Sequence, residues 1–168
     1  MDLQNKIAWC ELGVEEEKAF LRKYGSDLDL KITPQKSEQK TAIDLYHTVD
    51  NLYADLKSQS TPFFMAEKKY GIDPQYAVTF NRKDMWNYEG KSKKIGEIYI
   101  YFWVRWKDEE RYGAKVKAME GVWRIKFSDL LGLLDDSKLH RYRQRVGDKN
   151  GNAKDSFVVD LRQMEVVI

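Results

Sequence analysis

Cysteine and histidine are scarce in this sequence of 168 residues, and their scarcity excludes several kinds of site. Cys10 is the only cysteine, so no intrachain disulfide can form, which is typical of proteins from a reducing compartment. The two histidines, His47 and His140, lie far apart and in no His-x-x-x-His or Cys-x-x-Cys spacing, so a zinc site is not expected.

The chain also lacks long apolar runs and export signals. No run approaches the length of a membrane span, and residues 1–13 lack the basic and then apolar order of a signal peptide. We therefore expect a cytoplasmic protein without a membrane partner.

An excess of charge of one sign is missing as well. The 29 Lys and Arg residues nearly balance the 27 Asp and Glu residues, which leaves a net charge of +2. A purely electrostatic nucleic-acid binder is far more basic, so any contact with DNA must use local patches. The chain has no G-x-x-x-x-G-K-[ST] or G-x-G-x-x-G run, so nucleotide-driven activity lacks support. Ser58, Ser60 and Thr61 have no nearby histidine in a nucleophile arrangement, so acyl transfer lacks support as well.

Apolar periodicity predicts a mixture of helices and strands in a single domain, residues 1–168. We expect a helix over residues 3–24, a short helical piece at 66–71, a loop or brief helix at 83–94, and a helix with Ser128 as N-cap. We expect strands at 28–32, 42–46, 52–59, 76–81, 96–106, 112–127 and 156–161. These elements predict an α/β (mixed α+β) fold.

Strand 96–106 is expected at the centre of the sheet, because both of its faces are apolar or aromatic. Tyr99, Tyr101 and Trp103 share one face, and we interpret them as core residues in preference to a platform for base stacking.

Residues 42–59 form a predicted hairpin that brings charge to a sheet face. If the hairpin closes symmetrically between Val49 and Asp50, Tyr46 faces Tyr53, and Asp44 lies opposite Asp55. Directly opposed Cβ atoms are roughly 4.5–5.5 Å apart. Two carboxylates at that separation repel unless a proton or a cation lies between them.

The alternation of side chains then separates two faces of the second strand. One face carries Tyr53, Asp55, Lys57 and Gln59, and the other carries Leu52, Ala54 and Leu56. A turn centred on Asp50 and Asn51 would instead place Asp44 opposite Lys57, with Asp55 on the diagonal. The charged groups share a face in either register.

Asp44 followed by Asp55-Leu56-Lys57 resembles the signature of the PD-(D/E)XK nuclease superfamily. The resemblance implies a restriction-endonuclease-like core, with a helix followed by a central mixed β-sheet flanked by helices. It also implies magnesium-dependent hydrolysis of phosphodiester bonds in DNA, with Mn²⁺ as a substitute for Mg²⁺. The chain departs from the signature at Ile43, where the superfamily has a proline.

The resemblance also implies roles for particular residues. Asp44, Asp55 and the backbone carbonyl of Leu56 would hold the metal ion, and Lys57 would orient the attacking water and favour its deprotonation. A glutamate from the preceding helix often joins them. Glu17 is our preferred candidate and Glu16 the alternative, although both glutamates are also typical of a solvated helix N-terminus.

Two further features allow two interpretations each. Gln59 lies on the charged face, where it would hold a phosphate or the water, or would be an ordinary exposed strand residue. The basic segment 138–149 would contact phosphates or form a surface ion-pair network. The candidate DNA-binding residues in this segment are Arg141, Arg143, Arg145 and Lys149.

Other functions remain open from the sequence. Asp44, Asp55 and Lys57 could form a surface ion-pair ladder, although opposed aspartates are unfavourable there. The chain could keep the fold as an inactive nucleic-acid-binding or structural protein, or bind a small ligand or another protein. A homodimer is suggested by the resemblance alone.

Overall fold

The computed structural model describes residues 6–39, 42–142 and 155–168. Its helices are α1 (Lys6–Tyr24), α2 (Ala66–Tyr70), α3 (Arg82–Ile95) and α4 (Phe127–Leu133), with 3₁₀ turns η1 (Pro34–Ser37), η2 (Asp136–Lys138) and η3 (Leu161–Gln163). Its strands are β1 (Leu30–Ile32), β2 (Leu45–His47), β3 (Leu52–Gln59), β4 (Ala77–Asn81), β5 (Ile98–Trp106), β6 (Glu109–Arg111), β7 (Ala114–Val116), β8 (Met119–Lys126), β9 (Leu139–His140), β10 (Ser156–Asp160) and β11 (Glu165–Val166).

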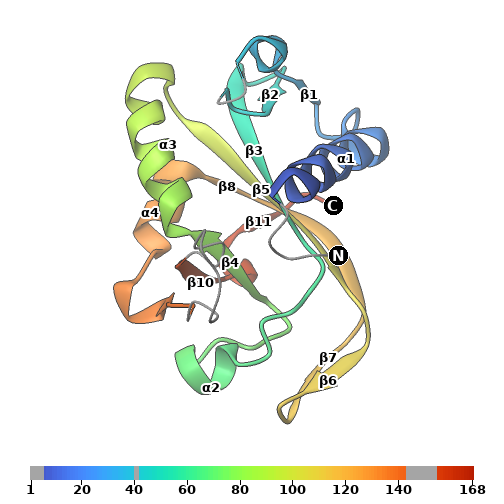
Figure 1. The fold of residues 1–168 in the computed structure, drawn as a ribbon, viewed down its shortest axis with the longest axis vertical. Helices are drawn as coiled ribbons and strands as arrows, with labels where there is room; N and C mark the ends of the chain where they lie inside the picture. The colour runs from blue at the N-terminus through green and yellow to red at the C-terminus, as the bar shows by residue number, and fades with distance from the viewer. Residues whose placement is uncertain (1–5, 40–41, 143–154) are drawn as a thin grey trace.

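Six strands of the described chain form a mixed sheet in the order β1-β2-β3-β5-β8-β11 (Figure 1). Only β3 and β5 pair in parallel within it, and the chain crosses between them through α2, β4 and α3. A smaller sheet, β4-β10-β9, and the β6-β7 hairpin complete the strands. The predicted coarse class, α/β with a central mixed sheet flanked by helices, is confirmed.

Both faces of the main sheet are covered. On one face, Phe20 of α1 packs on Trp103 of β5, with ring centroids 5.6 Å apart. On the other, Phe80 of β4 packs near Phe102 of β5, with α3 and α4 alongside. Strand β5 is therefore central, as predicted, and its aromatic face is core. None of the described helices is long and apolar enough to cross a membrane.

The β2-β3 hairpin has the symmetric register, the first of the two that its sequence allows. Tyr46 pairs with Tyr53, and their rings meet edge to face with centroids 5.5 Å apart. Asn51 adopts a left-handed conformation (φ 55°) at the end of the turn, which asparagine tolerates better than most residues. Asp44 directly precedes β2, so the register directs it toward Asp55 of β3.

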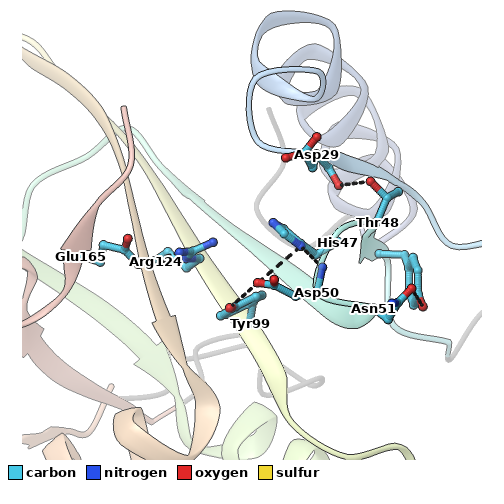
Figure 2. A network of polar contacts seen from close by, with 9 residues as sticks. Asp29, His47, Thr48, Asp50, Asn51, Tyr99, Arg124 and Glu165 are labelled. Carbon is cyan, nitrogen blue, oxygen red and sulfur yellow. Dashed lines mark hydrogen bonds and ion pairs between the residues drawn. The ribbon is translucent and has the colours of Figure 1, made fainter.

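A polar network fixes the turn of this hairpin against β5 (Figure 2). The Tyr99 hydroxyl donates to Asp50 Oδ2 at 2.7 Å, and the Asp50 backbone N–H donates to His47 Nδ1 at 3.0 Å. The Tyr99 hydrogen bond lowers the pKa of Asp50. Burial, with the Asp50 carboxylate beside it, raises the pKa of Tyr99 to about 12. The register matters because a slip of one residue would move every β3 side chain to the opposite face.

Three expectations for the second half of the chain were wrong in detail. The segment expected as a loop or brief helix is the long helix α3, capped by the Asn81 side chain. Helix α4 has Lys126 as its N-cap, and Ser128 instead donates to Glu97. The expected long strand 112–127 is divided into β7 and β8, and its first residue, Tyr112, lies in the left-handed turn of the β6-β7 hairpin.

The ring of His140 predicts a pH-dependent stability. Its Nδ1 lies 2.9 Å from the Tyr70 hydroxyl, and the rings of Phe63 and Tyr142 pack on it. Burial, with Lys69 nearby, lowers the pKa of His140 below its usual 6.5. The folded state then binds fewer protons than the unfolded state, so stability falls as the pH drops through about 6.5. We expect the melting temperature of His140→Phe to fall less than that of the native protein between about pH 7.5 and pH 5.

Candidate active site

Lys57 lies between two carboxylates on the face of β3 that α3 covers. Its Nζ is 2.9 Å from Asp55 Oδ2 and 2.7 Å from Asp84 Oδ2. Burial alone would lower the pKa of Lys57, but the two carboxylates outweigh it and raise that pKa well above its usual value. The side chain therefore carries its positive charge at every physiological pH.

Asp84 was not among the site residues predicted from the sequence, because the segment that contains it was not expected to form a long helix. It lies in the first turn of α3, which projects it toward β3. An assignment of residues 82–95 as a helix, with Asn81 as its cap, would have placed an acidic side chain at the start of a covering helix.

Asp55 is almost completely buried, with 4% of its surface exposed. Burial raises its pKa, and the charge and hydrogen bond of Lys57 offset this effect only in part. Tyr88 of α3 also hydrogen-bonds to the carboxylate. Asp55 Oδ2 nevertheless receives no hydrogen bond of acceptable geometry within the described part of the chain. The polar face of β3 is thus inside the protein, where an ionised aspartate needs a positive partner such as Lys57.

A second lysine links two further carboxylates. Lys36 of η1 contacts Glu17 of α1, and its Nζ lies 2.9 Å from Asp44 Oδ1. Glu17 is 6% exposed, and burial raises its pKa, with the negative charges of Asp44 and Asp55 adding to the effect. For Lys36, the hydrogen bonds to both carboxylates outweigh burial and raise the pKa.

Of the two candidate glutamates of α1, Glu17, which was preferred from the sequence, lies beside Asp44. Glu17 is brought beside Asp44 by the shared Lys36. Glu16 instead pairs with Arg105 of β5 and accepts a hydrogen bond from Ser58. Those contacts, with burial opposing them, lower the pKa of Glu16.

We call these six residues the carboxylate cluster: Glu17, Asp44, Asp55 and Asp84 with Lys36 and Lys57. With every group ionised, four carboxylates face two ammonium groups, which leaves an excess of two negative charges. The cluster joins α1, η1, the start of β2, β3 and α3, which are far apart in the chain.

The donor chemistry of the cluster fits a hard divalent cation, since carboxylate oxygens are the ligands that Mg²⁺ and Mn²⁺ prefer. The buried Oδ2 of Asp55, which forms an ion pair with Lys57 but receives no hydrogen bond of acceptable geometry among the described residues, is of this type. Among the described residues, however, no group of three or more His, Cys, Asp or Glu side chains is already arranged around a metal position. The residues fit a metal by chemistry, and the Lys36 ammonium lies between two of them.

An open cleft of about 830 Å³ leads to the cluster. The cleft is lined by the N-terminal half of α1, including Trp9, by the end of β3, and by Thr79 of β4 and Ser156 of β10. A smaller hollow of about 210 Å³ reaches Asp44 and Asp55 from the side of α3. Asp44 therefore lines both hollows, whereas Asp55 lines only the smaller one.

Gln59 is neither an exposed strand residue nor a free phosphate ligand in this structure. Its Nε2 donates to the Thr79 carbonyl at 2.8 Å, and its Oε1 accepts from the Thr79 N–H at 3.2 Å. The side-chain amide thus joins β3 of the main sheet to β4 of the small sheet. Leu56 lies in the β3-β5 ladder opposite Tyr101 and also lines the cleft.

The candidate DNA-binding segment is described only in part. Arg141 is exposed and follows His140 of β9, whose strand partner Ser156 lines the cleft. The other three predicted residues lie outside the described residues; they are Arg143, Arg145 and Lys149.

Comparison of the chain with protein-family models, with curated proteins and with solved structures gives no significant match in any of the three. The functional assignment therefore depends on the geometry and chemistry of the cluster itself.

Proposed function

We propose that the protein is a metal-dependent nuclease that hydrolyses phosphodiester bonds in DNA. The observation that carries this proposal is that Glu17, Asp44 and Lys57 line one open cleft, with Asp55 buried behind them in contact with Lys57. A helix followed by a mixed sheet, with the acid-x-lysine pattern on a strand of that sheet, is consistent with a restriction-endonuclease-like core. That finer fold assignment is part of the proposal.

The metal ligands in this proposal are Glu17, Asp44, Asp55 and the backbone carbonyl of Leu56. A bound Mg²⁺ or Mn²⁺ ion would supply a water of lowered pKa and a positive charge for the reacting phosphate. Lys57, which stays charged, donates a hydrogen bond that orients the attacking water and favours its deprotonation.

Asp84 acts through Lys57, so we describe it as a positioning residue. Its 2.7 Å contact restricts a flexible side chain to one orientation beside Asp55. Fixing a catalytic group in this way lowers the entropic part of the barrier.

The proposal is tested by incubating the protein with end-labelled single-stranded, duplex and branched DNA in Mg²⁺ or Mn²⁺, and with a chelator. We expect products only with the metal, and none from Asp55→Asn under the same conditions. Cleavage that is equal with and without a chelator would contradict the proposal, and so would the absence of cleavage of all three DNA forms.

The cleft also predicts a preference for unpaired DNA. Trp9 is 44% exposed and lines the cleft, so its ring is available to a base that has left its stack. Base stacking on an aromatic side chain is worth about 1–3 kcal/mol. We expect Trp9→Ala to weaken binding of a labelled oligothymidylate about tenfold in Ca²⁺, as measured by fluorescence anisotropy.

Trp86 provides the matched control for Trp9. It is also exposed, but it lies on α3 under the guanidinium of Arg82 and does not line the cleft. Trp86→Ala is expected to bind the oligonucleotide as the native protein does. Equal losses in the two variants would exclude Trp9 as a stacking residue.

The alternative is an inactive nucleic-acid-binding or structural protein with the same fold. The observation in its favour is that Lys36 already pairs with Glu17 and Asp44. It predicts DNA binding that is indifferent to divalent metal. A homodimer and a cytoplasmic location stay predictions.

A further inference from the structure

We infer that Lys36 is an internal counter-ion that competes with the divalent cation for Glu17 and Asp44, and so sets the affinity of the protein for metal. This inference rests on the proposed function, since it concerns the same carboxylates. It assigns a role to a residue that the acid-x-lysine pattern does not contain.

The positions of the atoms make the two cations mutually exclusive. Lys36 Nζ contacts Glu17 and lies 2.9 Å from Asp44 Oδ1. A Mg²⁺ ion bound directly to the same oxygens would lie about 2.0–2.1 Å from them. Two positive charges would then lie within a few ångströms of each other in a partly buried site, where water screens them poorly.

The charge of the cluster points to the same competition. Two ammonium groups offset half of its four carboxylates. If Lys36 leaves Glu17 and Asp44, three negative charges remain uncompensated, and a divalent cation offsets two of them. Lys57 has no such freedom, because Asp55 and Asp84 hold it beneath α3.

The side chain of Lys36 is also able to move away from Glu17 and Asp44. It belongs to η1, a single turn of four residues between β1 and β2. Its side chain is 23% exposed and lines the open cleft, so the ammonium can turn toward water without a change of the backbone. The four flexible carbons of lysine permit this movement.

The inference is tested by titrating Mn²⁺ alone into the full chain in a calorimeter, without DNA. We expect Lys36→Met to bind Mn²⁺ at least about tenfold more tightly than the native protein, because a positive charge beside the ligands is gone. Lys36→Arg, which keeps the charge, is expected to stay within about threefold of the native affinity. Lys31→Met removes an exposed lysine of β1 and is expected to change nothing.

The outcomes distinguish a failure of the role inferred for Lys36 from a failure of the proposed metal site. If the native protein and Lys36→Met bind Mn²⁺ equally well, Lys36 does not compete, and the inference fails while the proposed function stands. If neither protein binds Mn²⁺ although melting curves show both to be folded, the metal site and the proposed function fail. If Lys31→Met gains affinity as much as Lys36→Met, the effect is one of net charge, and the inference also fails.

Discussion

Replacing Lys57 by alanine is expected to reduce the single-turnover rate of DNA cleavage by about 10²-fold or more, while metal and DNA still bind. Asp44 and Asp55 remain in this variant, so these two proposed metal ligands are intact. The loss would reflect the attacking water, which no longer receives the hydrogen bond of the Lys57 ammonium. The rate is measured at saturating DNA in Mg²⁺, and affinity is measured separately in Ca²⁺.

Lys57→Ala leaves Asp55 and Asp84 without the ammonium group that they share, so a second variant with the lysine still present is needed for comparison. Asp84→Asn keeps the lysine and removes one of its two partners. We expect this variant to slow cleavage less than Lys57→Ala, about tenfold, with an unchanged Kd for DNA. A native rate in a folded Lys57→Ala protein would contradict the nuclease proposal.

A substitution at Arg141 is expected to separate DNA binding from catalysis. It is exposed and belongs to the basic segment beyond β9. We expect Arg141→Ala to weaken DNA binding and to reduce its dependence on salt, because one phosphate contact and its released counterion are lost. Its single-turnover rate at saturating DNA should equal that of the native protein. The opposite responses of Lys57→Ala and Arg141→Ala would distinguish the two roles.

Asp55→Asn is expected to abolish the stabilisation that metal gives to the native protein. A ligand that binds the folded state alone adds about 2.7 kcal/mol to the free energy of unfolding at a hundredfold excess over its Kd. The native protein should gain this amount in Mn²⁺, measured by urea denaturation, and Asp55→Asn should gain almost none. Asp129→Asn, an exposed change in α4, serves as the control and should respond as the native protein does.

The same substitution has an expected effect without metal. Burial raises the pKa of Asp55, so the folded state binds more protons than the unfolded state between the two pKa values. Stability is therefore lost as the pH rises above the usual pKa of an aspartate. Asparagine does not ionise, so metal-free Asp55→Asn should be at least as stable as the native protein at neutral pH. A strongly destabilised metal-free variant would show that the carboxylate has a structural role.

The hairpin was predictable from the sequence because its information is local. The alternation of side chains assigned Asp55 and Lys57 to one face in either of the two registers that the turn allowed, and the structure has the one with Tyr46 opposite Tyr53. The central position of strand β5 was predictable too, because a strand that is apolar on both faces is usually covered on both sides and therefore lies at the centre of a sheet. For α1, helical spacing brought Glu17 close to the buried Phe20.

The remaining parts of the site depend on contacts between distant segments. Helix α3 has few apolar residues, so the helical periodicity of its sequence is weak. The segment was therefore not expected to form a long helix, and Asp84 was not identified as a site residue. Lys36 lies in a polar stretch and reaches Glu17, 19 residues earlier in the chain, only because η1 folds beside α1. The backbone of Thr79 engages Gln59 for a similar reason, since β4 enters a second sheet that local pattern does not predict.

The most direct test of the central claim is the anomalous diffraction of Mn²⁺ in crystals of the native protein grown with the ion. The account predicts a single strong peak in contact with Asp44 and Asp55, with Glu17 within reach and the Lys36 ammonium turned away from both acids. A peak elsewhere, or no peak at saturating Mn²⁺ with Lys36 still between Glu17 and Asp44, would contradict it.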